Sequence, residues 1–101
     1  MADKRVLTYE YSGDAGAKVP IILEDFDHAY RGVQLEPIVT GVGYVQSTLS
    51  SKQDIDDGHA GWVTWPAGSI SAVTQDTVDP VVTAIRVYLT SGNLKLTLRM
   101  I

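Results

Sequence analysis

The feature that most constrains this chain is a two-residue alternation of apolar and polar side chains near its C-terminus. In residues 85–89 and again in residues 94–100, every second side chain is Ile, Val, Leu or Met. Successive side chains of a β-strand point to opposite faces, so each run predicts a strand with one apolar face. Ser91-Gly92-Asn93 separates the two runs, and Gly and Asn tolerate the positive φ of a tight loop. We therefore predict a C-terminal β-hairpin.

Weaker strand signals recur at a spacing of roughly ten residues, separated by turn residues, as in a β-sandwich or small barrel. The first segment is residues 4–11, in which Leu7, Tyr9 and Tyr11 lie on one face. The other segments are residues 19–23, 32–40, 43–49, 62–65 and 70–74. We predict that residues 1–101 form one antiparallel β-sandwich domain of jelly-roll or Ig-like type. Its expected core comprises Leu7, Tyr9, Ile85, Val87, Leu89, Leu94, Leu96 and Leu98.

Helix signals are confined to two short segments. Ser50 or Ser51 precedes Asp54 in a pattern that resembles a capping box with Asp in place of Glu. Residues 23–30 offer Asp25 as a second cap. Each segment has room for only a turn or two of helix.

Composition and charge exclude several classes of site. The chain has no Cys, so disulfides and thiolate metal ligands are impossible. The net charge is −4 and the Lys and Arg residues are scattered, so we expect no nucleic-acid partner. An apolar leader segment is missing, as is the run of roughly 18 apolar residues that a membrane helix needs. We expect a protein made in a cytoplasm, without a membrane partner.

The two histidines raise the question of a metal or an acid–base pair. His28 and His59 each follow Asp residues, and such groups can hold a divalent cation or transfer protons. The simpler interpretation is that these are polar loops in which Asp and Gly serve turn geometry. Counting from Asp54, the twelfth position of a calcium loop is Trp65, where a bidentate Glu belongs. We therefore reject an EF-hand and predict no metal site and no cofactor; a looser carboxylate site in residues 54–59 is the alternative.

Nucleophilic catalysis has no recognisable motif in this chain. No Ser lies in a Gly-x-Ser-x-Gly elbow, and neither His is tied to a Ser by a known spacing. We predict no catalytic residues. A small enzyme using His59 with Asp56 or Asp57 is the least favoured alternative.

Aromatic residues are candidates for contacts with other molecules. Trp62 and Trp65 have opposite parity, so on a strand they face opposite sides and one of them belongs to the core. Exposed Trp and Tyr rings stack on sugars and also anchor protein interfaces. A carbohydrate-binding or host-attachment module using Trp65, Tyr44 or Tyr88 is therefore the main alternative to an assembly protein.

The C-terminal part carries a family resemblance. The segments WVTWPAG at residues 62–68, TVDPVVTAIRV at 77–87, TSG at 90–92 and LKLTL at 94–98 follow one another. From residue 62 to residue 101 this pattern resembles the C-terminal part of small virion proteins of tailed bacteriophages. In those proteins a Trp-Pro turn leads to a Pro-Val-Thr-Ala-Ile-Arg strand and a final Ser-Gly hairpin. The resemblance brings no catalytic residues with it.

What the resemblance implies is a structural component of a bacteriophage particle. The expected role is a capsid decoration or cement protein that stabilises the head by protein–protein contacts; a head-fibre or tail-associated part is the other possibility within the family. The expected location is the virion, after synthesis in the host cytoplasm. Analogy suggests a homotrimer that contacts the major capsid protein or another virion protein.

The last strand is a candidate for an interface. Ile101 places an apolar side chain on the outward face of this strand, beside Arg99. We therefore expect the strand to be a sheet edge, whose unpaired N–H and C=O groups invite pairing with another chain. The candidate interface residues are Trp65, Arg86, Tyr88, Arg99 and Ile101.

Overall fold

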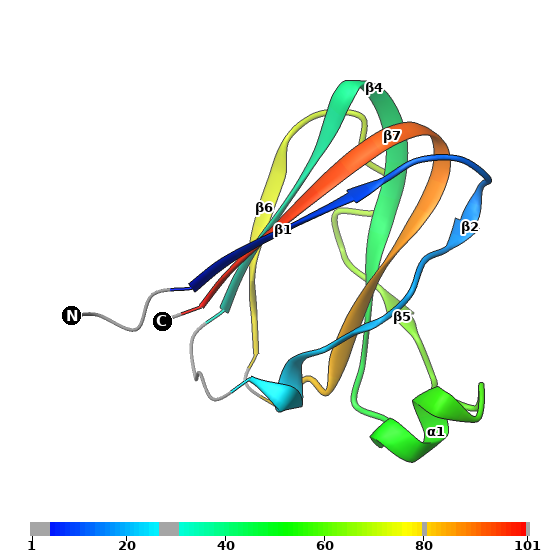
Figure 1. Ribbon diagram of the computed structural model, residues 1–101, viewed down its shortest axis with the longest axis vertical. Helices are drawn as coiled ribbons and strands as arrows, with labels where there is room; N and C mark the ends of the chain where they lie inside the picture. The colour runs from blue at the N-terminus through cyan, green and yellow to red at the C-terminus, as the bar shows by residue number, and fades with distance from the viewer. Residues whose placement is uncertain (1–4, 27–30, 80, 101) are drawn as a thin grey trace.

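Two long antiparallel strands form the centre of the fold (Figure 1). The computed structural model describes residues 5–26, 31–79 and 81–100. Strands β4 (Arg31–Thr48) and β7 (Ala84–Met100) pair from one end to the other, with Arg31 opposite Met100 and Thr48 opposite Ala84. The remaining elements are β1 (Arg5–Tyr11), β2 (Gly16–Ala17), β3 (Ile21–Ile22), the 3-10 helix η1 (Leu23–Asp25), α1 (Lys52–Asp56), β5 (Val63–Thr64) and β6 (Thr74–Val78).

The shorter strands flank the β4–β7 pair on both sides. β1 pairs with the C-terminal half of β7, whereas β2 and β3 pair with its N-terminal half. On the other side, β6 pairs with the N-terminal half of β4 and β5 with its C-terminal half. The sheet therefore has four rows, in the order β1/β2/β3, β7, β4 and β5/β6.

β4 and β7 bend together at their midpoints (Figure 1). The register between them is interrupted after Pro37 and resumes at Gly41, which lies opposite Gly92. A methyl group at Gly41 would overlap the carbonyl oxygen of Asn93, and one at Gly92 would crowd the carbonyl oxygen of Thr40. Gly92 also has a φ of 68°. Glycine is required here because the two backbones approach too closely for a Cβ atom.

The predicted C-terminal hairpin is wrong. Residues 85–89 and 94–100 belong to one bent strand, and each run pairs with β4 rather than with the other run. The Ser-Gly-Asn segment forms a bend and does not reverse the chain. Its residues suit either outcome, because a bend and a tight turn both need residues that tolerate positive φ. The prediction that the last strand is an edge is also wrong, since β7 is paired on both sides. Ile101 itself lies outside the described residues.

One hydrophobic cluster joins the two halves of the bent sheet. Every apolar residue of the β7 alternation is fully buried, and Val33, Leu35 and Val45 of β4 are buried with them. Leu7 and Tyr9 are half-buried and pack against this cluster, so the predicted apolar faces are confirmed. The predicted antiparallel all-β fold is confirmed as well. The strands form one continuous sheet, because β4 and β7 pass from one half to the other without interruption.

The short helices lie outside the sheet. The hydroxyl oxygen of Ser51 accepts a hydrogen bond from the Asp54 backbone N–H at 3.2 Å, so Ser51, and not Ser50, is the N-cap of α1. Of the second expected helix, residues 23–25 form η1 and residues 27–30 lie outside the described residues. The expected Asp25 cap is wrong, because Asp25 is the last residue of η1 and Ile22 occupies the N-cap position. The backbone N–H groups of Leu23 and Glu24 donate to the Thr83 carbonyl oxygen. Among the described residues, no helix is long and apolar enough to span a membrane.

Candidate interaction surface

The sheet half formed by the C-terminal part of β4 and the N-terminal part of β7 carries a cluster of large polar and aromatic side chains. The buried residues of these strands alternate with residues that point outward. The register places Tyr44 opposite Tyr88 and Gln46 opposite Arg86. Trp62, just before β5, completes the set. We call these five residues the aromatic face.

The aromatic rings of this face are held by specific contacts. The Tyr44 and Tyr88 rings stack with centroids 4.9 Å apart and an interplanar angle of 3°. The Arg86 guanidinium carbon lies 4.3 Å from the centre of the Trp62 ring, within the range of a cation–π interaction. Stacking and cation–π contact both restrict side-chain rotation. The face is therefore ordered before any partner arrives, which lowers the entropic cost of binding.

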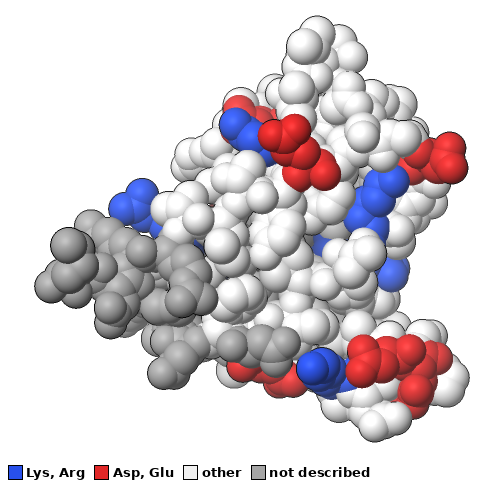
Figure 2. All heavy atoms as spheres, viewed as in Figure 1, with Lys and Arg blue, Asp and Glu red and all other residues white. Residues whose placement is uncertain are grey.

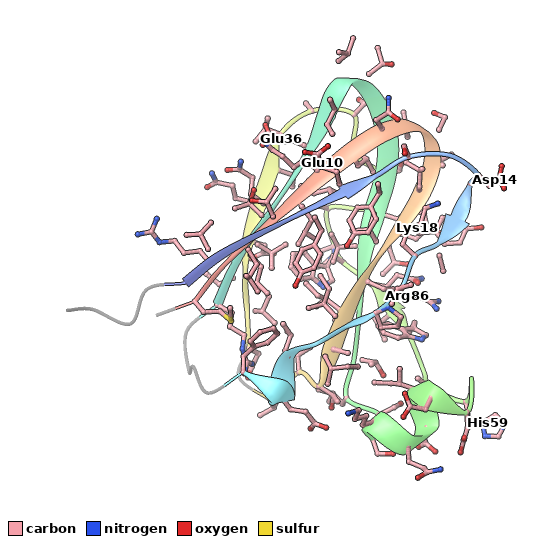
Figure 3. All side chains as sticks on the ribbon, viewed as in Figure 1. Glu10, Asp14, Lys18, Glu36, His59 and Arg86 are labelled. Atoms are coloured by element: carbon pink, nitrogen blue, oxygen red, sulfur yellow. The ribbon has the colours of Figure 1, made fainter. Side chains whose placement is uncertain are left out.

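Gln46 links the face across three strands. Its Oε1 atom accepts a hydrogen bond from Arg86 Nε at 2.8 Å, and its Nε2 atom donates to Thr64 Oγ1 at 3.2 Å. Burial lowers the pKa of Arg86 from its ordinary value, while Tyr44 and Tyr88 act in the opposite direction. The charged guanidinium is thus partly desolvated and has no carboxylate within ion-pair distance among the described residues. Arg86 and Lys18 are labelled in Figure 3; the Lys18 backbone N–H donates to the Val87 carbonyl oxygen at 2.8 Å, and its Nζ donates to the carbonyl oxygens of Ser12 and Asp14.

The structure brings only part of the predicted interface together. Arg86 and Tyr88 lie on the aromatic face, where Arg86 contacts Trp62 and Tyr88 stacks on Tyr44. Trp65 points the other way, is half-buried and packs against the core. Arg99 lies on the outer face of the opposite sheet half, where it pairs with Gly32. The opposite parity of the two tryptophans is therefore confirmed, with Trp65 on the core side.

Sequence reasoning missed Gln46 and left the side of Trp62 open. Gln46 has no motif around it, and its role depends on its register opposite Arg86. Alternation alone predicts that Gln46 lies on the same face as Tyr44, two residues earlier. Its pairing with Arg86 depends on the register between β4 and β7, which residues far apart in the chain determine.

A second feature lies on the outer face of the other sheet half. A hollow of about 550 Å³ opens over Gly32, and Val6, Gln34 and Arg99 lie at its borders. The register forms two rungs across the sheet here. One rung runs through Val6, Arg99, Gly32 and Thr77, and the next through Thr8, Thr97, Gln34 and Gln75.

The acidic segment around α1 forms a separate charged surface. Figure 2 shows acidic side chains gathered over α1. The backbone N–H of His59 donates to the Asp54 carbonyl oxygen at 2.7 Å, and Gln53 Nε2 donates to Asp57 Oδ2 at 3.0 Å. His59 is exposed. Within residues 5–26, 31–79 and 81–100, no group of three or more His, Cys, Asp and Glu side chains is arranged to hold a metal. His28 lies outside the described residues.

No family model, no curated protein and no solved structure matches this chain.

Proposed function

We propose that this protein is a structural component of a bacteriophage particle, and within that class a capsid decoration or cement protein. It would act by protein–protein contact and would not catalyse a reaction. The bacteriophage part of the proposal rests on the resemblance of residues 62–101. The observation that carries the binding part is the aromatic face, where Trp62, Arg86 and Tyr88 converge on one sheet surface.

The composition of this face suits a protein partner. Trp, Tyr and Arg are the residues that most often dominate the binding energy of protein interfaces. Arg86 is held by Trp62 and Gln46, so its remaining N–H groups are oriented for an acceptor on the partner. The partner in this proposal is the major capsid protein or another virion protein, together with copies of the chain itself.

The alternative that the same aromatic residues bind carbohydrate has weaker support. Sugar rings stack on open aromatic faces. Here the Tyr44 and Tyr88 rings cover one face of each other, and Arg86 covers one face of Trp62. Trp65 packs against the core. The rings are therefore already engaged within the chain, which favours a protein interface at this surface.

Intact particles provide the test. Antibodies raised against the purified protein should label particles purified from the source that encodes it. Particles made without the protein should lose their contents at a lower temperature, and adding back the purified wild-type protein should restore the original resistance. The double variant Arg86→Ala/Tyr88→Ala should fold but fail to restore it, whereas Thr8→Ala, on the other sheet half, should act as wild type. Unlabelled particles, or equal resistance without the protein, would contradict the proposal.

A further inference from the structure

The backbone conformation at Gly32 does not require a glycine, and neither does the space around it. It lies in β4 and is paired on both sides, with Arg99 of β7 and Thr77 of β6. Glycine in a strand weakens the strand, so such a position usually marks a bulge or the close approach of a ligand or another backbone. The φ of Gly32 is outside the left-handed region, and a Cβ atom there would meet no described heavy atom within 4 Å. Gly41 differs, because the backbone of Asn93 crowds it.

The missing side chain opens the hollow of about 550 Å³ described above. Because Gly32 contributes no atoms to the outer face, the space between Arg99 and Thr77 stays empty down to the sheet backbone. A volume of this size lies within the range of roughly 300–1,000 Å³ that is typical of small-molecule sites. Any side chain at residue 32 would fill the floor of the hollow. Gly32 is thus the residue that keeps the hollow open.

The borders of the hollow offer both donors and acceptors. Gln75 Nε2 donates to Gln34 Oε1 at 2.7 Å, which orients both amides. The hydroxyls of Thr77 and Thr97 can donate and accept, whereas Arg99 only donates. Asp76 also lines the hollow, where its Oδ1 accepts a hydrogen bond from the Thr77 backbone N–H at 2.8 Å, and no carboxylate of the described residues lies within ion-pair distance of Arg99. A ligand rich in hydroxyl groups matches this mixture, because each hydroxyl also donates and accepts.

An apolar side chain completes the hollow. Val6 of β1 is 52% exposed and lines it next to Arg99. A sugar ring has an apolar C–H face as well as hydroxyl groups, so it can contact Val6 while its hydroxyls meet the amides and Arg99. We propose that the hollow over Gly32 binds a saccharide of one or two rings. This site lies on the sheet half opposite the aromatic face, and the proposal does not depend on the particle function.

Titration followed by NMR tests the site. The probes are glucose, galactose, mannose, N-acetylglucosamine, rhamnose, glucuronate and maltose, each at concentrations that would saturate a millimolar site. At least one should produce saturable shifts of the Gly32, Thr77, Thr97 and Arg99 signals. Gly32→Val should weaken that binding by about tenfold or more, equivalent to about 1.4 kcal/mol. Its melting temperature should not fall, because Val suits a strand and the space is empty.

Two controls define the outcomes. Gly61→Val adds the same side chain at another glycine with open surroundings, and it should bind the saccharide as wild type does. Acetate should not reproduce the shifts. The proposal is overturned if no probe shifts these signals, if Gly32→Val binds as tightly as wild type, or if acetate alone reproduces the effect, which would indicate a simple anion site. Shifts confined to Tyr44, Trp62 and Tyr88 would also overturn it and move the saccharide to the aromatic face.

Discussion

Leu96 lies at the centre of the fully buried side of β7, opposite Leu35 of β4 and Tyr9 of β1. Replacing it with Ala removes buried methyl groups and leaves a cavity that the surrounding strands cannot fill. We expect Leu96→Ala to lower the free energy of unfolding by about 2–5 kcal/mol. Thr8→Ala, at an exposed position on β1, should change it by less than about 0.5 kcal/mol. Urea denaturation of both variants checks this, and an unchanged midpoint for Leu96→Ala would contradict the assigned face.

Tyr11 should make the free energy of unfolding decrease as the solution becomes alkaline. Burial, with a smaller effect from Tyr9, raises the pKa of Tyr11 to about 12. The unfolded-state value is about 10. Because the folded-state value is higher, Tyr11 contributes stability that is fully present below a pH of about 10 and is lost as the pH rises through about 12. We expect Tyr11→Phe to remove this part of the alkaline decline. Urea unfolding across that pH window measures it, and identical profiles for the two proteins would contradict the assignment.

At the scale of elements, the shared bend of β4 and β7 depends on close backbone contact. A methyl group at Gly41 would overlap the carbonyl oxygen of Asn93. We expect Gly41→Ala to destabilise the protein by roughly 1–3 kcal/mol, as overpacking generally does. Gly32→Ala is the matched control, since it adds the same methyl group to empty space in the same strand. If thermal denaturation gives equal midpoints for the two variants, the bend does not require this approach.

The same elements show what the sequence can and cannot predict. Alternation identified the buried side of β7 correctly, because the direction of a side chain on a strand is local. It could not distinguish a hairpin from a bend at Gly92, because both use the same turn residues. It also could not reveal that Gln46 lies opposite Arg86, because strand register depends on residues far apart in the chain. The members of the aromatic face were therefore only partly predictable.

The α1 segment provides a test of the expected absence of a metal. Its carboxylates Asp54 and Asp57 lack the bidentate Glu that a calcium loop needs, and the chain has no Cys ligand. We expect the melting curve to be the same with and without a chelator. The measurement is thermal denaturation in EDTA, followed by addition of calcium or zinc. A lower midpoint that either ion restores would contradict the prediction and direct attention to His59.

At the scale of the whole molecule, the central position of β7 changes where association is expected. Ile101 was the reason to expect an interface at the last strand, but β7 is paired on both sides and Met100 is fully buried. Deleting residues 100 and 101 is therefore expected to weaken the fold rather than only the assembly. Among the described residues, the rows that are paired on one side only are β1/β2/β3 and β5/β6. Unpaired strand edges favour contacts with other chains.

The oligomeric state of the purified protein and of an aromatic-face variant shows which surface holds the copies together. We expect the purified protein to form a homo-oligomer, with three copies by analogy to particle decoration proteins. If the aromatic face makes the contact, Arg86→Ala/Tyr88→Ala should dissociate the oligomer without unfolding the monomer, because neither side chain belongs to the core. If the sheet edges make the contact, that variant should keep the wild-type mass. Light scattering separates these cases. A wild-type monomer at high micromolar concentration would contradict self-association, and binding to assembled shells would then have to come from the aromatic face of a single copy.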